Sequence, residues 1–330
     1  MIGTAPANPF LVAVLPTPNG DRTRAVANNL INRSVETSWG VSAQLDAELG
    51  TVTFTSITAY RSYDDHEIRD GDFLPQAHVG VSQLADDGPQ RGKTFSEELR
   101  LTSPNAGFFT YLAGFYFSHA YSERVFSRSD VVCGLAPGQS PPTALVPCGA
   151  AAAGPSTTPF GIADFGSTFP NTALFGEGTA HFIDKLRGII GLRYTLDQLD
   201  VFHIRTTTLA GAGIQPSFDA GICNTDATAT LPSGAVVFVP GAPNGQYYRN
   251  RANKEKLSGR VGLQYDLTRD VMAYGTYSRG YKGPAFNTFF KLTTTGAGAG
   301  SIAAETADSY EGGLKTAFLD RKPNLDVAAY

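Results

Sequence analysis

Long apolar runs are missing from this 330-residue sequence. A membrane-spanning helix needs about 20 consecutive apolar residues, whereas the longest apolar runs here are 11–15 and 235–239. Neither run follows a basic segment or leads into a small-residue cleavage site, so neither is typical of a signal peptide. The missing leader indicates either a cytoplasmic protein or a chain whose front end lies outside the sequence.

Charge is also scarce. Charged residues make up 17% of the chain, against about a quarter in an ordinary soluble domain. The formal net charge is -4, so the sequence lacks the excess of basic residues that binding to nucleic acid requires. We therefore exclude nucleic acid as a partner.

Only three cysteines occur, and none belongs to a CxxC pair. No histidine lies near them at ligand spacing, so no metal site is predicted. Cys133 and Cys148 share one Gly/Pro/Ala-rich stretch and could form a loop disulfide in an oxidising compartment. Cys223 is left as the odd thiol.

Catalytic and cofactor motifs are absent as well. The sequence has no GxSxG elbow, no GxxxxGK[ST] loop, no GxGxxG after a strand and no paired histidines at HxxxH spacing. We therefore expect no enzyme and no cofactor.

What the sequence does have is alternation with a period of two. From Val41 to Leu49 apolar and polar residues alternate without exception, and Leu257–Leu267 repeats the pattern. Side chains alternate faces along a strand, so each such row predicts one apolar sheet face. Strands are expected at 37–49, 51–63, 94–103, 107–125, 171–183, 186–205, 254–267, 270–282, 305–318 and 323–330.

The connections between these strands alternate strictly between short and long. Short turns are expected near residues 50, 103–107, 184–185, 267–270 and 319–322, and long links at 64–93, 126–170, 206–253 and 283–304. Outer-membrane barrels have short periplasmic turns and long extracellular loops. Most predicted strands have ten or more residues, which suits a tilted membrane crossing. The pattern predicts an all-β, antiparallel up-and-down transmembrane barrel.

In such a barrel the apolar rows would meet lipid, and the polar rows would line a watery lumen. We expect lumen-facing charges at Arg187, Arg193, Arg260, Lys315, Glu177, Asp197, Asp266 and Glu311. Aromatic residues near strand ends would form a girdle at the membrane boundary, and the candidates are Trp39, Tyr60, Tyr63, Tyr194, Tyr277 and Tyr281.

The richest polar cluster lies at the start of the first long link. Its carboxylates and imidazole could meet a ligand or a divalent cation, since hard cations prefer carboxylate oxygens. An exposed charged loop is the plainer interpretation. The candidate ligand-binding residues are Asp64, Asp65, His66, Glu67, Asp70 and Asp72.

Several segments resemble TonB-dependent receptors. These are the strand at 51–64 (TVTFTSITAYRSYD), the "SEELRL" strand at 95–104, YLAGFYFS at 111–118, the element at 277–287 ending YKGPAFN, and ETADSYEGGLK at 305–315. The resemblance implies a 22-stranded barrel with an N-terminal plug that carries the TonB box. Because about ten strands are predicted and no plug-like sequence precedes residue 37, we expect a central barrel fragment lacking the plug and the C-terminal strands. Residues 1–36 would be a loop and strand remnant, and residues 37–330 the partial barrel.

The resemblance further implies a receptor and transporter in the outer membrane. It would take up a scarce nutrient such as a ferric siderophore, with TonB acting through the plug of the full-length protein. A passive porin and a soluble β-rich binding domain are the alternatives.

Overall fold

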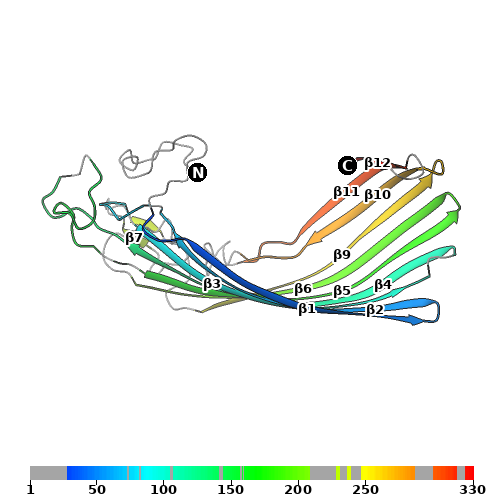
Figure 1. Cartoon of the computed structure of the whole chain (residues 1–330), viewed down its shortest axis with the longest axis horizontal. Coiled ribbons are helices and arrows are strands. Elements are labelled where there is room, and N and C mark those ends of the chain that lie inside the picture. Colours follow the sequence, from blue (N-terminus) through cyan, green and yellow to red (C-terminus); the bar gives the residue numbers. More distant parts are fainter. Residues whose placement is uncertain are drawn as a thin grey trace.

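Ten strands form one antiparallel sheet in simple chain order (Figure 1). The computed structural model describes residues 28–72, 74–81, 83–104, 107–140, 144–156, 158, 160–208, 228–230, 236–238, 247–286, 300–317 and 324–330. The strands are β1 (Arg33–Leu49), β2 (Val52–Asp70), β3 (Gln83–Thr102), β4 (Phe109–Val131), β5 (Phe160–Ile183), β6 (Leu186–Thr208), β9 (Tyr248–Asp266), β10 (Val271–Lys282), β11 (Glu305–Ala317) and β12 (Asn324–Ala329). Two short strands, β7 (Thr228–Thr230) and β8 (Val236–Phe238), pair with each other.

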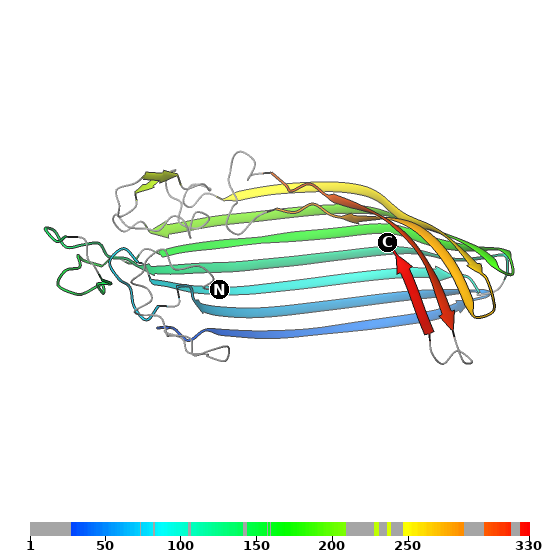
Figure 2. The ribbon, with the colours of Figure 1, turned by 90° about the horizontal axis from the view of Figure 1, so that it is seen from above.

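The sheet is a long, curved trough. Its short turns gather at one end, and its long links gather at the other (Figure 1). Seen from above, strands β1 to β6 and β9 run side by side along the molecule (Figure 2). Within the described part of the chain, no helix is long and apolar enough to span a bilayer. The predicted meander of ten antiparallel strands, with short and long connections in alternation, is confirmed.

The strands extend further toward the long-link end than the sequence indicated. The first link, predicted to begin at residue 64, begins only after Asp70, because β2 stays paired with both neighbours: Ile68 faces Arg33 on β1, and Asp70 faces Ala85 on β3. Strand β5 likewise begins at Phe160 instead of residue 171. The charge-rich and proline-containing segments thus belong to the strands.

Two prolines explain why these extensions were missed. Proline has no N–H to give to a ladder, so it is read as a strand breaker. Here the β3–β4 ladder skips Pro89 and the β5–β6 ladder skips Pro170, while each proline stays in register with its other neighbour, opposite His66 and His119 respectively. The sheet therefore tolerates both prolines by leaving one side unpaired.

The register collects the apolar rows of all ten strands on one side of the sheet, here called the apolar face. Directly opposed residues in an antiparallel pair share a face, and Val41, Tyr60 and Phe95 are opposed in succession across β1, β2 and β3. Large side chains on this face are strongly exposed; Leu45, Leu174 and Leu263, for example, are 61%, 62% and 57% exposed. Further exposed members are Val35, Trp39, Leu101, Ile190, Leu192, Leu257, Val261, Leu314, Leu325 and Val327.

The opposite side, here called the polar face, carries most of the sheet's buried side chains. Phe126 is 1% exposed and Val201 4%. The same face carries the charges predicted to line a lumen, including the ion pairs Arg187–Asp266 at 2.8 Å and Arg260–Glu177 at 2.6 Å. A sheet that exposes its leucines on one face and carries its buried side chains together with these ion pairs on the other is inverted relative to a water-soluble one.

One carboxylate breaks the pattern of the apolar face. Glu97 lies between Phe95 and Leu99 on that face of β3. Its carboxylate accepts hydrogen bonds from Ser56 Oγ at 2.7 Å and Thr58 Oγ1 at 2.5 Å. Its oxygens are therefore satisfied from the neighbouring strand, which limits the cost of placing them there.

Aromatic rings border the apolar face at both ends. Toward the long links, the pairs Trp39–Tyr60 and Tyr277–Tyr310 have ring centroids 5.4 and 5.0 Å apart. Toward the short turns lies Phe108–Phe182, at 6.3 Å. Trp39, Tyr60, Tyr194 and Tyr277 thus lie on the apolar face, but in the middle of their strands and not near the strand ends as predicted, because the strands are longer than the sequence indicated.

Tyr63 does not share this face, contrary to the prediction. It lies on the polar face, where its ring covers Gly92 on β3 so closely that a Cβ added there would be 2.3 Å from ring atom Cε1. A glycine is required at that position because the ring occupies the space of a side chain. Tyr281 also differs, since it lies beyond Arg279, where β10 stops pairing with β9, and its hydroxyl is buried.

An arginine on the apolar face should cost far more than one on the polar face. Val261→Arg would place a charge in the middle of the apolar band and should lower the free energy of unfolding in lipid bilayers by about 2–4 kcal/mol. Thr276→Arg, on the polar face at the same level and opposite Glu311, should change it by about 0.5 kcal/mol or less. Urea titration in bilayers measures both, and equal costs would contradict the assignment of faces.

Candidate functional site

The long-link end of the sheet carries a hydrogen-bonded structure, here called the loop cap, made of residues 71–72, 74–81, 131–140 and 144–154. The two links are joined by backbone hydrogen bonds: Val79 N–H donates to Val146 O at 2.8 Å, and Cys148 N–H donates to Ala77 O at 2.9 Å. Cys133 and Cys148 form a disulfide with Cα atoms 5.8 Å apart. The β4–β5 link is therefore closed on itself and fixed to the β2–β3 link. Cys223 lies outside the described residues.

A buried ion cluster lies on the polar face at the end of the strands that lead into the cap. Asp86 of β3 accepts from Arg128 Nε at 2.5 Å and Nη2 at 2.9 Å, and from Arg69 Nη2 at 2.8 Å. The side chains of Asp86 and Arg128 are 3% and 6% exposed. Both Arg124 and Arg128 also lie over the ring of Phe126, at 5.5 and 5.8 Å. Two-point bonding and a nearby second cation give the buried carboxylate the compensation it needs.

Two further aspartates shape the turn that follows β2. The fully buried Asp70 accepts from the backbone N–H of Asn29 at 3.3 Å and of Asp72 at 3.2 Å. Asp72 in turn accepts from the N–H groups of Leu74, at 2.8 Å, and Leu84. Burial raises the pKa of Asp72 to about 6. The main chain holds these carboxylates as structural acceptors.

The structure does not bring the six predicted ligand residues together. Asp64 to Asp70 belong to β2, where alternation separates neighbours onto opposite faces. On the polar face, Asp65 accepts from Ser34 Oγ at 2.9 Å, and Glu67 pairs with Arg124 at 2.8 Å. On the apolar side, the imidazole Nε2 of His66 lies 2.8 Å from Asp87 Oδ1.

No group of three or more His, Cys, Asp or Glu residues is placed to hold a metal ion in the described part of the chain. The continuous acidic stretch therefore does not form a single chelating cluster there. Its members act with different partners on different strands.

The polar face holds a second group of partners farther down the sheet. Arg193 of β6 lies over the rings of Tyr116 and Phe175, at 5.3 and 5.6 Å. Like the Asp86 cluster, this grouping joins residues far apart in sequence. Sequence reasoning missed both because cross-strand neighbours depend on the register, which alternation alone does not fix.

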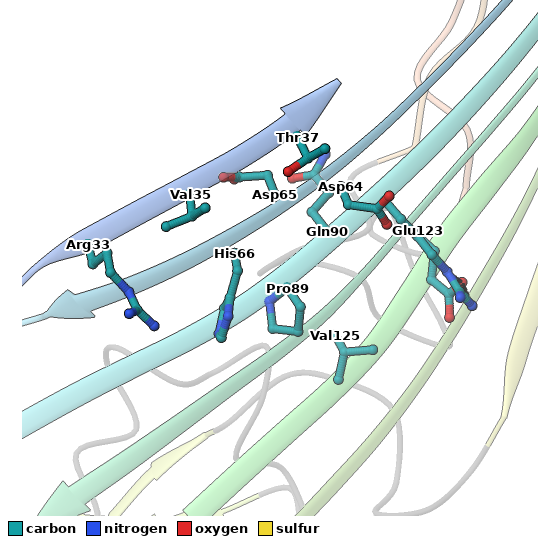
Figure 3. A pocket seen from close by; sticks show the side chains of 11 residues that line it. Arg33, Val35, Thr37, Asp64, Asp65, His66, Pro89, Gln90, Glu123 and Val125 are labelled. Atoms are coloured by element: carbon teal, nitrogen blue, oxygen red, sulfur yellow. Dashed lines mark hydrogen bonds and ion pairs between the residues drawn. The ribbon is translucent and has the colours of Figure 1, made fainter. Parts of the chain in front are cut away.

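A groove of about 630 Å³ runs across β1 to β4 on the same side as the apolar face, and is here called the outer groove (Figure 3). Register places its lining residues beyond the row formed by Trp39, Tyr60 and Phe95. Figure 3 shows His66, Pro89 and Val125 on neighbouring strands. The lining residues are Arg33, Val35, Thr37, Asp64, Asp65, His66, Pro89, Gln90, Arg91, Glu123 and Val125.

Removing the buried carboxylate should destabilise the protein strongly. Asp86→Ala would leave two guanidinium groups without their shared partner and should lower the free energy of unfolding by about 3–5 kcal/mol. Glu177→Ala breaks an exposed pair, in which Arg260 is 54% exposed, and should cost at most about 1 kcal/mol. Urea titration compares the two variants, and a similar loss in both would show that burial does not set the strength of the Asp86 cluster.

The turn after β2 should become more stable in acid. The pKa of Asp72 is about 6 in the folded protein, above its usual value of 3.8, so between these values the folded turn holds a proton that the unfolded chain has lost. Stability is therefore gained as the pH falls through 6. Hydrogen exchange of the Leu74 and Leu84 amides should slow from pH 7.5 to pH 5 once corrected for intrinsic rates. Asp72→Asn should abolish this change, and persistence of the change in that variant would assign it to another group.

Three solved structures share this fold. The ferric yersiniabactin uptake receptor FyuA from Yersinia pestis aligns with a TM-score of 0.57 and 17% identity, over 90% of this chain and 35% of that one. The ferric-catecholate import receptor Fiu from E. coli K12 gives 0.56 and 16%, and the siderophore receptor PiuA from Acinetobacter baumannii gives 0.53 and 14%, each over 90% of this chain and 40% of the other. The chain thus spans well under half the length of these proteins.

The family assignment comes from the sequence as a whole. Residues 4–330 match the family model described as "TonB dependent receptor-like, beta-barrel". This match agrees with the ten-stranded meander, its inverted faces and its alternating connections. Members of the family are receptors and transporters of the outer membrane, and this chain belongs to the β-barrel domain family of TonB-dependent receptors.

Proposed function

We propose that the protein containing this chain is an outer-membrane receptor that takes up a scarce nutrient, such as a ferric siderophore, in a TonB-dependent manner. The observation that carries the proposal is the family match over residues 4–330. The similar structures are named as receptors for ferric yersiniabactin, for ferric catecholates and for a siderophore. The chain would supply part of the barrel wall.

The chemistry of the polar face suits the inner wall of a lumen that contains other polar groups. It carries paired charges such as Arg187–Asp266, together with cations such as Arg193 that stack on aromatic rings. Such a wall can contact a plug and a hydrated ligand without placing unpaired charges in hydrocarbon. We propose that TonB acts through a plug in the whole protein, and that the apolar face contacts outer-membrane lipid.

We place ligand contact at the long-link end, on the polar face. Asp65 and Glu67 are the members of the predicted acidic set whose strand positions point to that face. Asp70 and Asp72 accept backbone N–H groups beside the loop cap and would shape the mouth. The barrel part is taken as residues 37–330, with β1 already paired from Arg33, and residues 1–27 lie outside the described residues. No catalytic role is proposed.

Two alternatives make different predictions. A passive porin would admit its solute without an energy source. A soluble β-rich binding domain would fold without detergent, and the strongly exposed leucines of the apolar face argue against it, since they would form a large apolar patch in water.

Energy dependence distinguishes TonB-dependent uptake from passive diffusion through a porin. Cells that express the whole protein should accumulate a radiolabelled ferric siderophore, and deletion of TonB or collapse of the proton gradient should reduce accumulation at least tenfold. A parallel assay with a small hydrophilic sugar controls for passive leakage. Accumulation that persists without TonB would favour the porin and contradict the proposal.

A further inference from the structure

The long-link part of β9 has a strand neighbour on one side only. On the β6 side, its ladder continues to the end of the strand, where Tyr248 faces His203. On the β10 side, the ladder ends where Gly259 faces Arg279. Figure 2 shows β9 (yellow) continuing toward the long links beyond the ends of β10 and β11. Among the residues that the structure describes, the segment 248–258 therefore forms an unpaired strand edge, here called the open edge.

The chain that follows β10 lies against the polar face and not beside the open edge. A Cβ built on Gly283 would lie 2.7 Å from Asp197 Oδ2 and 3.7 Å from Phe169 Cζ. Asp197 belongs to β6 and is opposite Lys254 of β9. The chain therefore passes over side chains of β5 and β6 at the level where it would otherwise continue the β9–β10 ladder.

Every second residue of the open edge directs its backbone N–H and C=O groups away from β6. Asp266 N–H donates to Lys185 O at 2.9 Å, so Asp266 bonds toward β6. Bonding direction alternates along an antiparallel strand, and the register between β6 and β9 has no shift. The residues that bond away from β6 are therefore Arg249, Arg251, Asn253, Glu255 and Leu257.

A side-chain hydrogen bond supports this direction. The backbone N–H of Arg251 donates to Oδ1 of Asn250 at 2.8 Å, whereas in a paired strand it would donate to the neighbouring strand. Unpaired backbone groups along a strand edge are a template for pairing with another chain. The open edge thus presents backbone donors and acceptors to a further strand.

The open edge is basic. Residues 249–256 read RNRANKEK. Arg251 pairs with Asp200, whereas Lys254 and Lys256, both on the polar face, have no ion-pair partner among the described residues. Lysines on an edge discourage pairing with most strands, but opposite charges on paired strands stabilise the pairing. The charge of the open edge therefore favours an acidic strand.

The open edge lies on the extracellular side of the apolar face. Val261 faces Tyr277, whose ring belongs to the aromatic pairs that border the apolar face toward the long links. Residues 248–258 lie beyond this level, and the long links of outer-membrane barrels are extracellular. A polypeptide outside the cell can therefore reach the edge through water.

We propose that the open edge binds an extended, acidic polypeptide segment of an extracellular partner by adding it to the sheet as a strand. Backbone hydrogen bonds supply the affinity in strand addition, and side chains supply the specificity. Carboxylates of the added strand would pair with Lys254 and Lys256, and its backbone would replace Asn250 as the partner of Arg251 N–H. This inference rests on the membrane placement of the chain and is independent of the nutrient taken up.

Binding of defined peptides tests the proposal. The whole protein in nanodiscs would be titrated against a fluorescent peptide as long as the open edge, in which glutamate alternates with threonine, and fluorescence anisotropy would be measured. The same peptide with lysine in place of glutamate is the control. The glutamate peptide should bind at least about tenfold more tightly than the lysine peptide. Lys254→Glu combined with Lys256→Glu should reverse this preference.

A proline substitution distinguishes strand addition from simple charge attraction. Asn253→Pro removes a backbone N–H that points away from β6 and leaves the β6 ladder intact. It should weaken binding of the glutamate peptide by about tenfold or more, because one hydrogen bond is lost and the ring obstructs the edge. Asn253→Ala is the matched control, since it removes the same side chain but keeps the N–H, and it should bind like the wild type. Heat-dependent gel mobility reports a folded barrel in each variant.

The proposal is overturned if neither peptide binds, if both peptides bind equally well, or if Asn253→Pro and Asn253→Ala bind the glutamate peptide equally well. Should Asn253→Pro fail to fold, the reversal of preference by the two lysine substitutions decides. None of these results changes the outcome of the siderophore uptake assay. The two proposals can therefore fail separately.

Discussion

The structure depends on the antiparallel register between neighbouring strands. Hydrogen-bonded ladders satisfy the backbone and fix which side chains share a face, as in the run from Val41 through Tyr60 to Phe95. A one-residue slip in any ladder would move a full row of leucines into the polar face and a full row of charges into lipid. The inverted distribution of apolar and charged side chains is therefore a consequence of register maintained across ten strands.

The same register divides each long strand into two parts. Strands β2 to β6 have 19 to 24 residues, about twice the 9–11 needed to cross a membrane. The half near the short turns carries the apolar face. The half near the long links continues beyond the aromatic row and carries the ion cluster around Asp86, the loop cap and the outer groove. The proposed lipid contact and the proposed ligand contact thus fall on different lengths of the same strands.

Alternation and turn spacing were enough to predict all ten strands, their antiparallel order and the apolar face. The strand extensions could not be predicted, because Pro89, Pro170 and the charges after Asp64 suggest loops when cross-strand pairing is unknown. The acidic stretch was treated as one cluster, although alternation puts Asp65 and His66 on opposite faces. The partners of Asp86 lie 17 and 42 residues away in sequence, so only the register could identify them.

A cysteine scan along β9 tests the central claim most directly. Single nitroxide labels from Leu257 to Asp266 would be placed on the whole protein in bilayers, and collision rates with oxygen and with a water-soluble nickel chelate would be measured. Labels at 257, 261, 263 and 265 should collide mainly with oxygen, and labels at 258, 260, 264 and 266 mainly with the chelate. A profile without a two-residue period, or with the opposite phase, would contradict the assignment of lipid to the apolar face.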